Sequence, residues 1–430
     1  MKKDIIYICE ECGNEFLKWN GKCDVCGAWN SLKELKSDLG HGIQKVEPAE
    51  SYIFSDIKTE TIKRIDTKID ELNRVLGDGI VPGSVILLGG DPGIGKSTLA
   101  LQLALKIPNV CYVTGEESLN QIGIRFERVS KNKNKLDKNY LIAETNLDSI
   151  EKTILKLRPS LVVIDSIQTM YLENFPSASG SLVQVRESAL RIIKMAKREN
   201  IATIIIGHVT KDGDIAGPKI LEHMVDVVLY LEGERYHDLR ILRGLKNRFG
   251  DATEIGIFKM DGTGLVEMPN PSSELLAERL GGPGSIVTAT IEGTRPFLVE
   301  IQALVNQSIF GYPKRSASGL DVQRLDLLLA VMKKFKVNLN SFDVYLNAVG
   351  GMKIKEPAVD LAIIVSLASV LFDKSVNKNL CIFGEVGLSG EIRKVRHQEK
   401  RENEALRLGY EILPKFKSLD KCLSFLFDKL

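Results

Sequence analysis

One short segment, GDPGIGKST at residues 90–98, constrains the fold of this chain more than any other. It follows the apolar run 85–88 and precedes a helical pattern at 97–106. A glycine-rich turn between a buried strand and a helix directs backbone N–H groups and the positive end of the helix dipole at one point, which suits a phosphate. We therefore predict that this segment binds the phosphates of ATP. Its residues are Gly90, Asp91, Pro92, Gly93, Ile94, Gly95, Lys96, Ser97 and Thr98.

The residues around this segment predict a parallel sheet. Short apolar runs lie at 110–113, 161–164, 202–206, 225–231 and 239–242, and helical stretches such as 183–198 fall between them. Buried strands that alternate with helices are typical of an α/β domain with helices on both faces of its sheet. We assign this domain, a P-loop ATPase core, to residues 59–270.

Polar residues at strand ends are the catalytic candidates. Lys96 would reach the β- and γ-phosphates, and Ser97 with Asp165, which ends the run 161–164, would hold Mg²⁺. Glu116 and Glu117 follow the strand 110–113, where a carboxylate would activate water. A turn cap for Asp165 and a solvated acidic turn for the glutamates are the alternatives.

His208 follows the strand 202–206 and is a candidate sensor of the γ-phosphate. A histidine with a purely structural role is the alternative.

Four cysteines near the N-terminus predict a metal site. Cys9 and Cys12 form one C-x-x-C pair, and Cys23 and Cys26 form a second one ten residues later. Four thiolates fill a tetrahedral Zn²⁺, so the metal would be structural, with redox chemistry as the weaker alternative. We assign residues 1–30 to this zinc finger and 31–58 to a linker. Trp19 and Trp29 are expected to pack the module, and stacking on DNA bases is the alternative for them.

Charge and hydropathy limit the classes of function. The net charge is +2, so a globally basic nucleic-acid binder is not indicated, and contact with DNA would need a local patch or a ring of subunits. The longest apolar stretch, 361–372, is too short to cross a bilayer. We therefore expect a cytoplasmic protein with no membrane partner and with reduced cysteines.

A proline-rich boundary at 268–273 separates a further α+β domain, which we place at 275–430. Its strands are expected at 285–291, 297–305 and 344–347. Helices are expected at 321–335 and 358–372.

Several motifs occur in one order along the chain. They are the four-cysteine module, LNRVLG at 72–77, the P-loop, TGEES at 114–118, IDSIQT at 164–169, KNRFG at 246–250 and GEVGL at 384–388. In this order they resemble the bacterial RadA (Sms) family of DNA-repair proteins over essentially the whole chain. KNRFG is the most family-specific of them, because a P-loop alone indicates only an NTPase.

The resemblance implies a RecA-like ATPase core in a hexameric ring. It implies binding of single-stranded and branched DNA, and branch migration of recombination intermediates together with the RecA recombinase. Lys246 and Arg248 match the family motif required for ATP-linked function on DNA. These two cations would contact either the γ-phosphate of ATP bound to a neighbouring subunit or the phosphates of DNA. The sequence does not distinguish between the two roles. The alternative function is a nucleotide-switched ring that loads RecA without translocation.

The C-terminal region resembles the proteolytic domain of Lon, as it does in the RadA family. The position of the catalytic serine corresponds to Ala358, and that of the lysine to Glu399, or to Lys400 after a slip of one residue. Without a nucleophile we expect no protease activity. The domain is instead expected to build the ring and to offer a basic surface to duplex DNA, with solvated lysines as the alternative. The candidates are Lys314, Arg315, Lys333, Lys334, Lys336, Lys353 and Lys355.

Overall fold

The chain divides into two compact units, Met1–Glu267 and Met268–Leu430. The computed structural model describes residues 6–11, 14–35, 53, 63–130, 138–207, 218–233, 238–309 and 311–427. Among these residues, no helix has the length and apolar character needed to cross a membrane.

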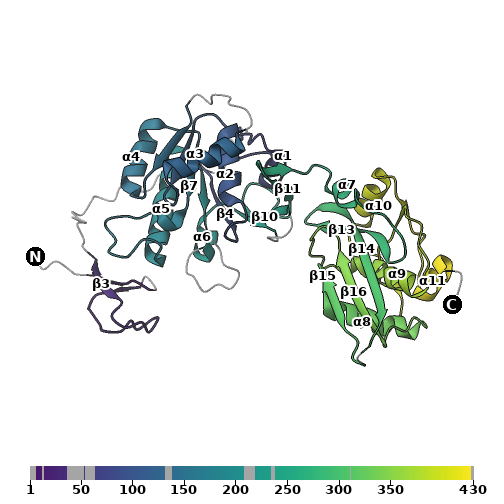
Figure 1. The fold of residues 1–430 in the computed structure, drawn as a ribbon. Helices are drawn as coiled ribbons and strands as arrows, with labels where there is room; N and C mark the ends of the chain where they lie inside the picture. The colour runs from purple at the N-terminus through teal and green to yellow at the C-terminus, as the bar shows by residue number, and fades with distance from the viewer. Residues whose placement is uncertain are drawn as a thin grey trace, which may run out of the picture. The chain divides into compact units, whose positions relative to one another are not determined.

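A nine-stranded sheet forms the centre of the first unit, in the order β12-β11-β10-β9-β4-β8-β7-β5-β6 (Figure 1). The strands from β9 to β6 run parallel, and β10, β11 and β12 extend the sheet in antiparallel fashion. This order, with β8 between the phosphate strand β4 and β7, confirms the predicted RecA-like α/β fold. The bounds are β4 Val85–Gly90, β5 Val110–Thr114, β6 Tyr140–Ala143, β7 Leu161–Asp165, β8 Ala202–Ile206, β9 Val227–Glu232, β10 Leu239–Asn247, β11 Ile255–Asp261 and β12 Gly264–Glu267.

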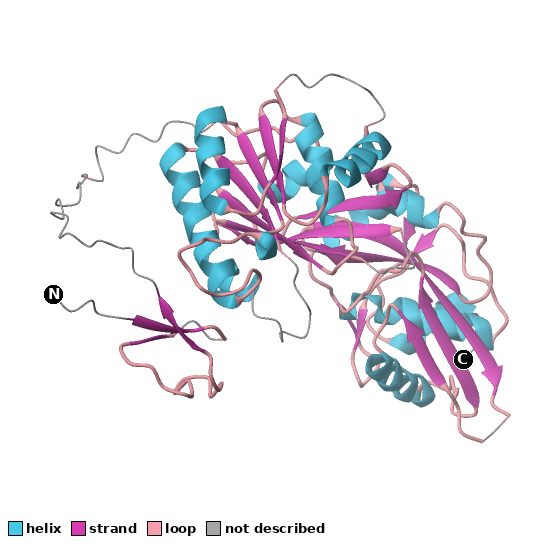
Figure 2. Cartoon of the chain, turned by 60° about the vertical axis from the view of Figure 1, so that its left-hand side comes forward, coloured by secondary structure: helices cyan, strands magenta, loops and turns pink. Residues whose placement is uncertain are grey.

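Helices cover both faces of this sheet (Figure 2). Because side chains alternate along a strand, Ile86 and Leu88 of β4 join one apolar core, and Val85 and Leu87 join the other. The first core includes side chains of α1 (Asp70–Leu76), α2 (Lys96–Lys106) and α3 (Leu119–Val129). The second includes side chains of α4 (Leu147–Leu157), α5 (Leu182–Glu199) and α6 (Pro218–Met224). Burial on both faces explains why the parallel strands are continuous apolar runs.

The N-terminal module is a small antiparallel sheet in the order β2-β1-β3. Its strands are β1 Ile6–Cys9, β2 Glu15–Phe16 and β3 Leu32–Leu35. Buried Cys9, Cys23 and Leu32 form its small core. The tryptophans lie outside the core of the module: Trp19 and Trp29 are 56% and 71% exposed, and the Trp19 indole contacts the module through a hydrogen bond of 3.2 Å to the Leu32 carbonyl. A module of this size has too little interior to enclose two indole rings.

The second unit is an α+β domain around a six-stranded sheet, in the order β15-β16-β14-β13-β17-β20. Helix α9 packs against β13 and β14, and it is buried from Asp360 to Ser369. Helices α7 and α10 also pack on β14. The strands are β13 Ser285–Glu292, β14 Arg295–Gln307, β15 Arg315–Ser318, β16 Phe342–Ala348, β17 Leu380–Cys381 and β20 Glu411–Ile412, with β18 Glu385–Val386 and β19 Ile392–Arg393 in a separate hairpin. The helices are α7 Pro271–Leu276, α8 Val322–Lys334, α9 Asp360–Leu371, α10 Gln398–Arg407 and α11 Leu419–Phe427.

Two ion pairs in the second unit each contain one fully buried partner. Arg401 is 1% exposed and donates hydrogen bonds to both carboxylate oxygens of Glu356. Asp360 is fully buried and accepts hydrogen bonds from Arg324 and from the amide of Val386. Buried charges of this kind require partners, and both carboxylates have them.

Candidate functional site

The phosphate loop is a tight turn from β4 into α2. Gly95 is the N-cap of α2, with φ of 118°. This backbone angle lies in the left-handed region, which favours glycine, and a Cβ there would also displace the Met260 methyl group, 2.6 Å away. The loop therefore brings backbone amides to the start of a helix, as the sequence predicts.

Lys96 is buried at the first turn of α2 and turns back over the loop. Its Nζ donates hydrogen bonds to the carbonyls of Gly90 at 2.7 Å and Asp91 at 3.0 Å. Burial lowers the pKa of Lys96, and the carboxylates of Asp165, Asp91 and Glu116 oppose this shift. A buried ammonium beside a helix start is a suitable partner for a phosphate anion.

Asp165 lies at the end of β7, next to the start of α2. Its Oδ1 accepts a hydrogen bond of 3.1 Å from the Ser97 hydroxyl, and its Oδ2 accepts one of 2.5 Å from the Tyr112 hydroxyl. Burial raises the pKa of Asp165, and these two hydrogen bonds act against the rise. A hydroxyl and a carboxylate close together form the hard oxygen set that Mg²⁺ prefers. The residues present therefore fit magnesium.

The two neighbouring glutamates have different partners. The turn after β5 lies close to the 3-10 helix Ile167–Thr169, since a Cβ on Gly115 would lie 2.1 Å from the Thr169 hydroxyl. In this turn Glu116 accepts a hydrogen bond from the Ser166 hydroxyl. Glu117 forms an ion pair with Arg125 of α3. The structure thus brings Ser97, Asp165 and the acidic turn to one edge of the sheet.

Two further residues contact the phosphate loop, and the sequence patterns did not predict this role for them. The Tyr230 hydroxyl of β9 donates a hydrogen bond of 3.3 Å to the Asp91 carboxylate. Arg240 of β10 is 6% exposed, and its Nε donates to the Ile94 carbonyl at 3.2 Å. An arginine within an apolar strand is the signal that indicates such a role for Arg240.

Lys246 and Arg248 contact groups of their own chain. Lys246 Nζ donates to the carbonyls at the end of α6, at 2.8 Å to Glu222, 3.3 Å to His223 and 2.8 Å to Val225. Arg248 pairs with buried Asp226 at 3.1 Å. The structure therefore gives both cations partners in their own subunit. His208, the predicted sensor, lies outside the described residues.

Three of the four predicted zinc ligands come together in the N-terminal module. The Sγ atoms of Cys9, Cys23 and Cys26 all lie within 4.8 Å of one another, and Cys9 and Cys26 are 3.6 Å apart. Thiolates about 2.3 Å from a tetrahedral zinc are roughly 3.8 Å apart, so these sulfurs fit that metal. Cys12 lies outside the described residues.

The residues expected at the positions of a Lon serine and lysine lie on different elements of the second unit. Ala358 is buried in the turn Pro357–Val359. Glu399 and Lys400 lie exposed on α10, where Lys400 donates to the Thr294 carbonyl at 3.2 Å.

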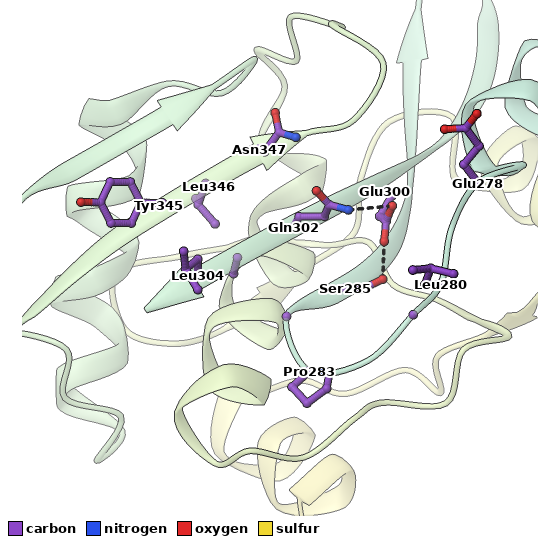
Figure 3. Close-up of a pocket in the computed structure, with 13 residues that line it drawn as sticks. Glu278, Leu280, Pro283, Ser285, Glu300, Gln302, Leu304, Tyr345, Leu346 and Asn347 are labelled. Atoms are coloured by element: carbon purple, nitrogen blue, oxygen red, sulfur yellow. Dashed lines mark hydrogen bonds between the residues drawn. The ribbon is translucent and has the colours of Figure 1, made fainter. Parts of the chain in front are cut away.

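The second unit also contains a cavity of about 450 Å³ beside β14. In Figure 3, Gln302 and Ser285 both point at Glu300, whose carboxylate they hydrogen-bond. Arg279 lies 3.5 Å from the same carboxylate. The hydrogen bond from Ser285 to Glu300 joins β13 to β14. The Glu300 carboxylate therefore stabilises the sheet.

Comparisons with known proteins agree with this geometry. Residues 53–214 match the model of an AAA domain, and residues 7–34 match the model of a rubredoxin metal binding domain. The chain is 49% identical over 423 residues to the DNA repair protein RadA of Listeria monocytogenes, covering 95% of this chain and 91% of that one. It is 47% identical over 420 residues to the DNA repair protein RadA of Bacillus subtilis, covering 94% and 91%.

Among solved structures, a KaiC-like protein of Pyrococcus horikoshii is 20% identical. The match covers 48% of this chain and 100% of that one, with a TM-score of 0.40.

Proposed function

The chain belongs to the family of the DNA repair protein RadA, and from this premise we propose that it is a DNA-dependent ATPase that drives branch migration of recombination intermediates. Its AAA domain supports the hydrolysis of ATP. The observation that carries the proposal is the contact of Ser97 with Asp165 beside the phosphate loop. Translocation on single-stranded and branched DNA, and cooperation with RecA, are the finer parts of the proposal.

Binding of ATP would begin with Lys96. On binding, its Nζ would exchange the carbonyls of Gly90 and Asp91 for oxygens of the β- and γ-phosphates. The loop amides and the start of α2 would bind the same phosphates. Ser97 and Asp165 would hold Mg²⁺, which neutralises charge on the phosphates when bound.

Hydrolysis needs a carboxylate that orients water and accepts its proton. The acidic turn Glu116–Glu117 supplies the candidates, since it lies beside the end of β7. His208 stays a proposed sensor of the γ-phosphate. Through it, the segment 211–219 would change its grip on single-stranded DNA with each ATP that is hydrolysed.

Assembly into a hexameric ring would place single-stranded DNA along the ring axis. Lys246 and Arg248 would act on a neighbour's γ-phosphate or on DNA phosphates, and in either role they would leave part of their present contacts with α6 and Asp226. The four-cysteine module would hold a structural Zn²⁺ through Cys9, Cys12, Cys23 and Cys26.

The second unit would serve as a scaffold without proteolysis, because Ala358 offers no nucleophile. Degradation of casein by the purified protein, lost in a Lys400→Ala variant, would contradict this part of the proposal.

The test of the ATPase is the Lys96→Ala variant, with ATP turnover measured in the presence and absence of single-stranded DNA. Turnover should fall to background, because Lys96 is the cation over the loop. Lys106→Ala is the matched control, since Lys106 is an exposed lysine at the end of the same helix. Unchanged turnover in Lys96→Ala would refute the site.

A second function, a nucleotide-switched ring that loads RecA, predicts ATP turnover without movement on DNA. Strand displacement on a forked substrate separates the two functions. A translocase releases the annealed strand in an ATP-dependent manner, and a scaffold releases none.

A further inference from the structure

The acidic turn beside the phosphate loop presents two adjacent carboxylates with different partners: Glu117 pairs with Arg125 of α3, and Glu116 accepts a hydrogen bond from Ser166. We infer that Arg125 is a positioning residue for ATP hydrolysis: it retains Glu117 in an ion pair and leaves Glu116 as the carboxylate that activates water. This inference rests on the proposed ATPase function and assigns distinct roles to two residues that the sequence does not separate.

The first observation is the attachment of Glu117. Its Oε1 pairs with Nη2 of Arg125, and the side chains of the two residues are 26% and 22% exposed. Within the described part of the chain, Oε2 of Glu117 and Nη1 of Arg125 are buried and have no hydrogen-bond partner. The pair is therefore held by one contact, and a Glu117 that turned toward water would leave a guanidinium without its counter-ion.

The second observation is the geometry that makes this pair. Ser118 is the N-cap of α3, and its hydroxyl and the Gln121 side chain form a capping box. The Glu117 amide also donates to the Thr114 hydroxyl at 3.2 Å. The turn and the start of α3 are thus fixed to each other, so Arg125, two helical turns from the cap, meets Glu117 in one arrangement.

The third observation is the location of Glu116. It accepts a hydrogen bond from the Ser166 hydroxyl, and Ser166 directly follows Asp165. Its charge acts on Lys96 together with those of Asp165 and Asp91. Glu116 therefore belongs to the group of residues around the phosphate site. A general base in this position could exchange the Ser166 hydroxyl for a water molecule.

The fourth observation is the local balance of charge. Glu116, Glu117 and Asp165 are three carboxylates near one another, and each of the other two acts on Glu117 electrostatically. Arg125 acts on both Glu117 and Asp165. Loss of Arg125 would therefore free a carboxylate that repels Glu116 and competes for the same water or metal.

The test is a double-mutant cycle in the full-length protein. ATP turnover with single-stranded DNA is measured for Glu116→Gln, Glu117→Gln, Arg125→Met and the double variant Arg125→Met with Glu117→Gln. Affinity for a non-hydrolysable ATP analogue and thermal unfolding are measured for each. Arg128→Met is the matched control, because Arg128 is an exposed arginine on the same helix.

Glu116→Gln should lower kcat by about 100-fold or more, with little change in affinity for the analogue. Glu117→Gln should lower kcat by no more than about fivefold, and Arg125→Met by roughly tenfold, the scale of coupling between residues in contact. The double variant should recover to the level of Glu117→Gln, because it contains neither the freed carboxylate nor the unpaired cation. Arg125→Lys should retain more activity than Arg125→Met.

The assignment would be refuted, without refuting the ATPase function, if Glu117→Gln lost turnover while Glu116→Gln remained active. It would also be refuted if the double variant were no faster than Arg125→Met. A role of Arg125 in folding alone would lower the unfolding temperature without the recovery of kcat, and that result also overturns it. Absence of turnover in the unchanged protein would refute the proposed function, and this assignment with it.

Discussion

The Ser97 hydroxyl, in the first turn of α2, donates a hydrogen bond of 3.1 Å to Oδ1 of Asp165, which ends β7. The two residues are 68 positions apart in the sequence. They meet because parallel strands present their carboxyl ends at one edge of the sheet, where loops and helix starts converge. This contact joins the start of α2 to the end of β7, and β7 pairs with β5, the strand that precedes the acidic turn.

Ser97→Ala and Asp165→Asn should each raise the magnesium concentration needed for half-maximal ATP turnover by about 10- to 100-fold. Each change removes one of the two oxygen groups proposed to hold the metal. The measurement is a magnesium titration of the ATPase rate at fixed ATP. Thr153→Ala, which removes a partly exposed hydroxyl on α4, serves as control. An unchanged magnesium dependence in both variants would show that the metal is held elsewhere.

Cys26→Ser should abolish the zinc content of the purified protein, which we expect to be about one ion per chain. The reason is that a hydroxyl replaces one of the clustered thiolates, and structural sites need all four ligands. Elemental analysis of the protein gives the content directly. Cys381→Ala should retain the metal, because Cys381 is buried in the second unit and is not one of the three clustered cysteines. Equal zinc contents in the two variants would refute the proposed metal site.

Lys246→Met should lower the free energy of unfolding by about 1 kcal/mol, since three carbonyls at the end of α6 lose a charged donor in a partly solvated setting. Chemical denaturation is the measurement, with Lys259→Met on the neighbouring strand β11 as control. A Lys246 that acts only on a neighbouring subunit or on DNA predicts identical denaturation curves for the variant and the unchanged protein.

Arg401→Met should destabilise the second unit by about 3 kcal/mol, because removal of the fully buried cation leaves the partly buried Glu356 carboxylate without its partner. Adding Glu356→Gln should restore part of this loss, since the buried charge is then also removed. Thermal unfolding measures both. A single variant as stable as the unchanged protein would mean that the pair contributes nothing.

The same pair gives a pH dependence. Burial by itself would raise the pKa of Glu356, but hydrogen bonds from Arg401 and Thr290 outweigh burial and hold this pKa below its ordinary 4.5. A carboxyl whose pKa is lower in the folded state stabilises the fold above pH 4.5 and loses this contribution as the pH falls through the folded value. Unfolding measured from pH 6 to about pH 3 should therefore show a steeper loss in the unchanged protein than in Glu356→Gln. Parallel curves would contradict the assigned shift.

The parts of this protein that could be predicted are those that neighbouring residues determine. The phosphate loop depends on glycines and a lysine within nine consecutive positions, and the proposed metal ligands lie in two close pairs. The core strands could be found because burial on both faces leaves each as an apolar run. Even Asp165 could be assigned, because it directly follows such a run.

The contacts between side chains of different elements could not be predicted and follow from the folded chain alone. No spacing in the sequence shows that Arg240 donates to the Ile94 carbonyl or that Lys246 donates to carbonyls at the end of α6. Nor does it show that Glu117 pairs with Arg125 while Glu116 accepts a hydrogen bond from Ser166. Such contacts depend on strand order and register, where a shift of one residue turns a side chain to the opposite face. The amino-acid sequence was enough to predict a phosphate-binding loop and the apolar strands of the core. Which charged side chain faces which partner was decided by folding, because several cations and carboxylates compete within reach and only the packed geometry selects among them.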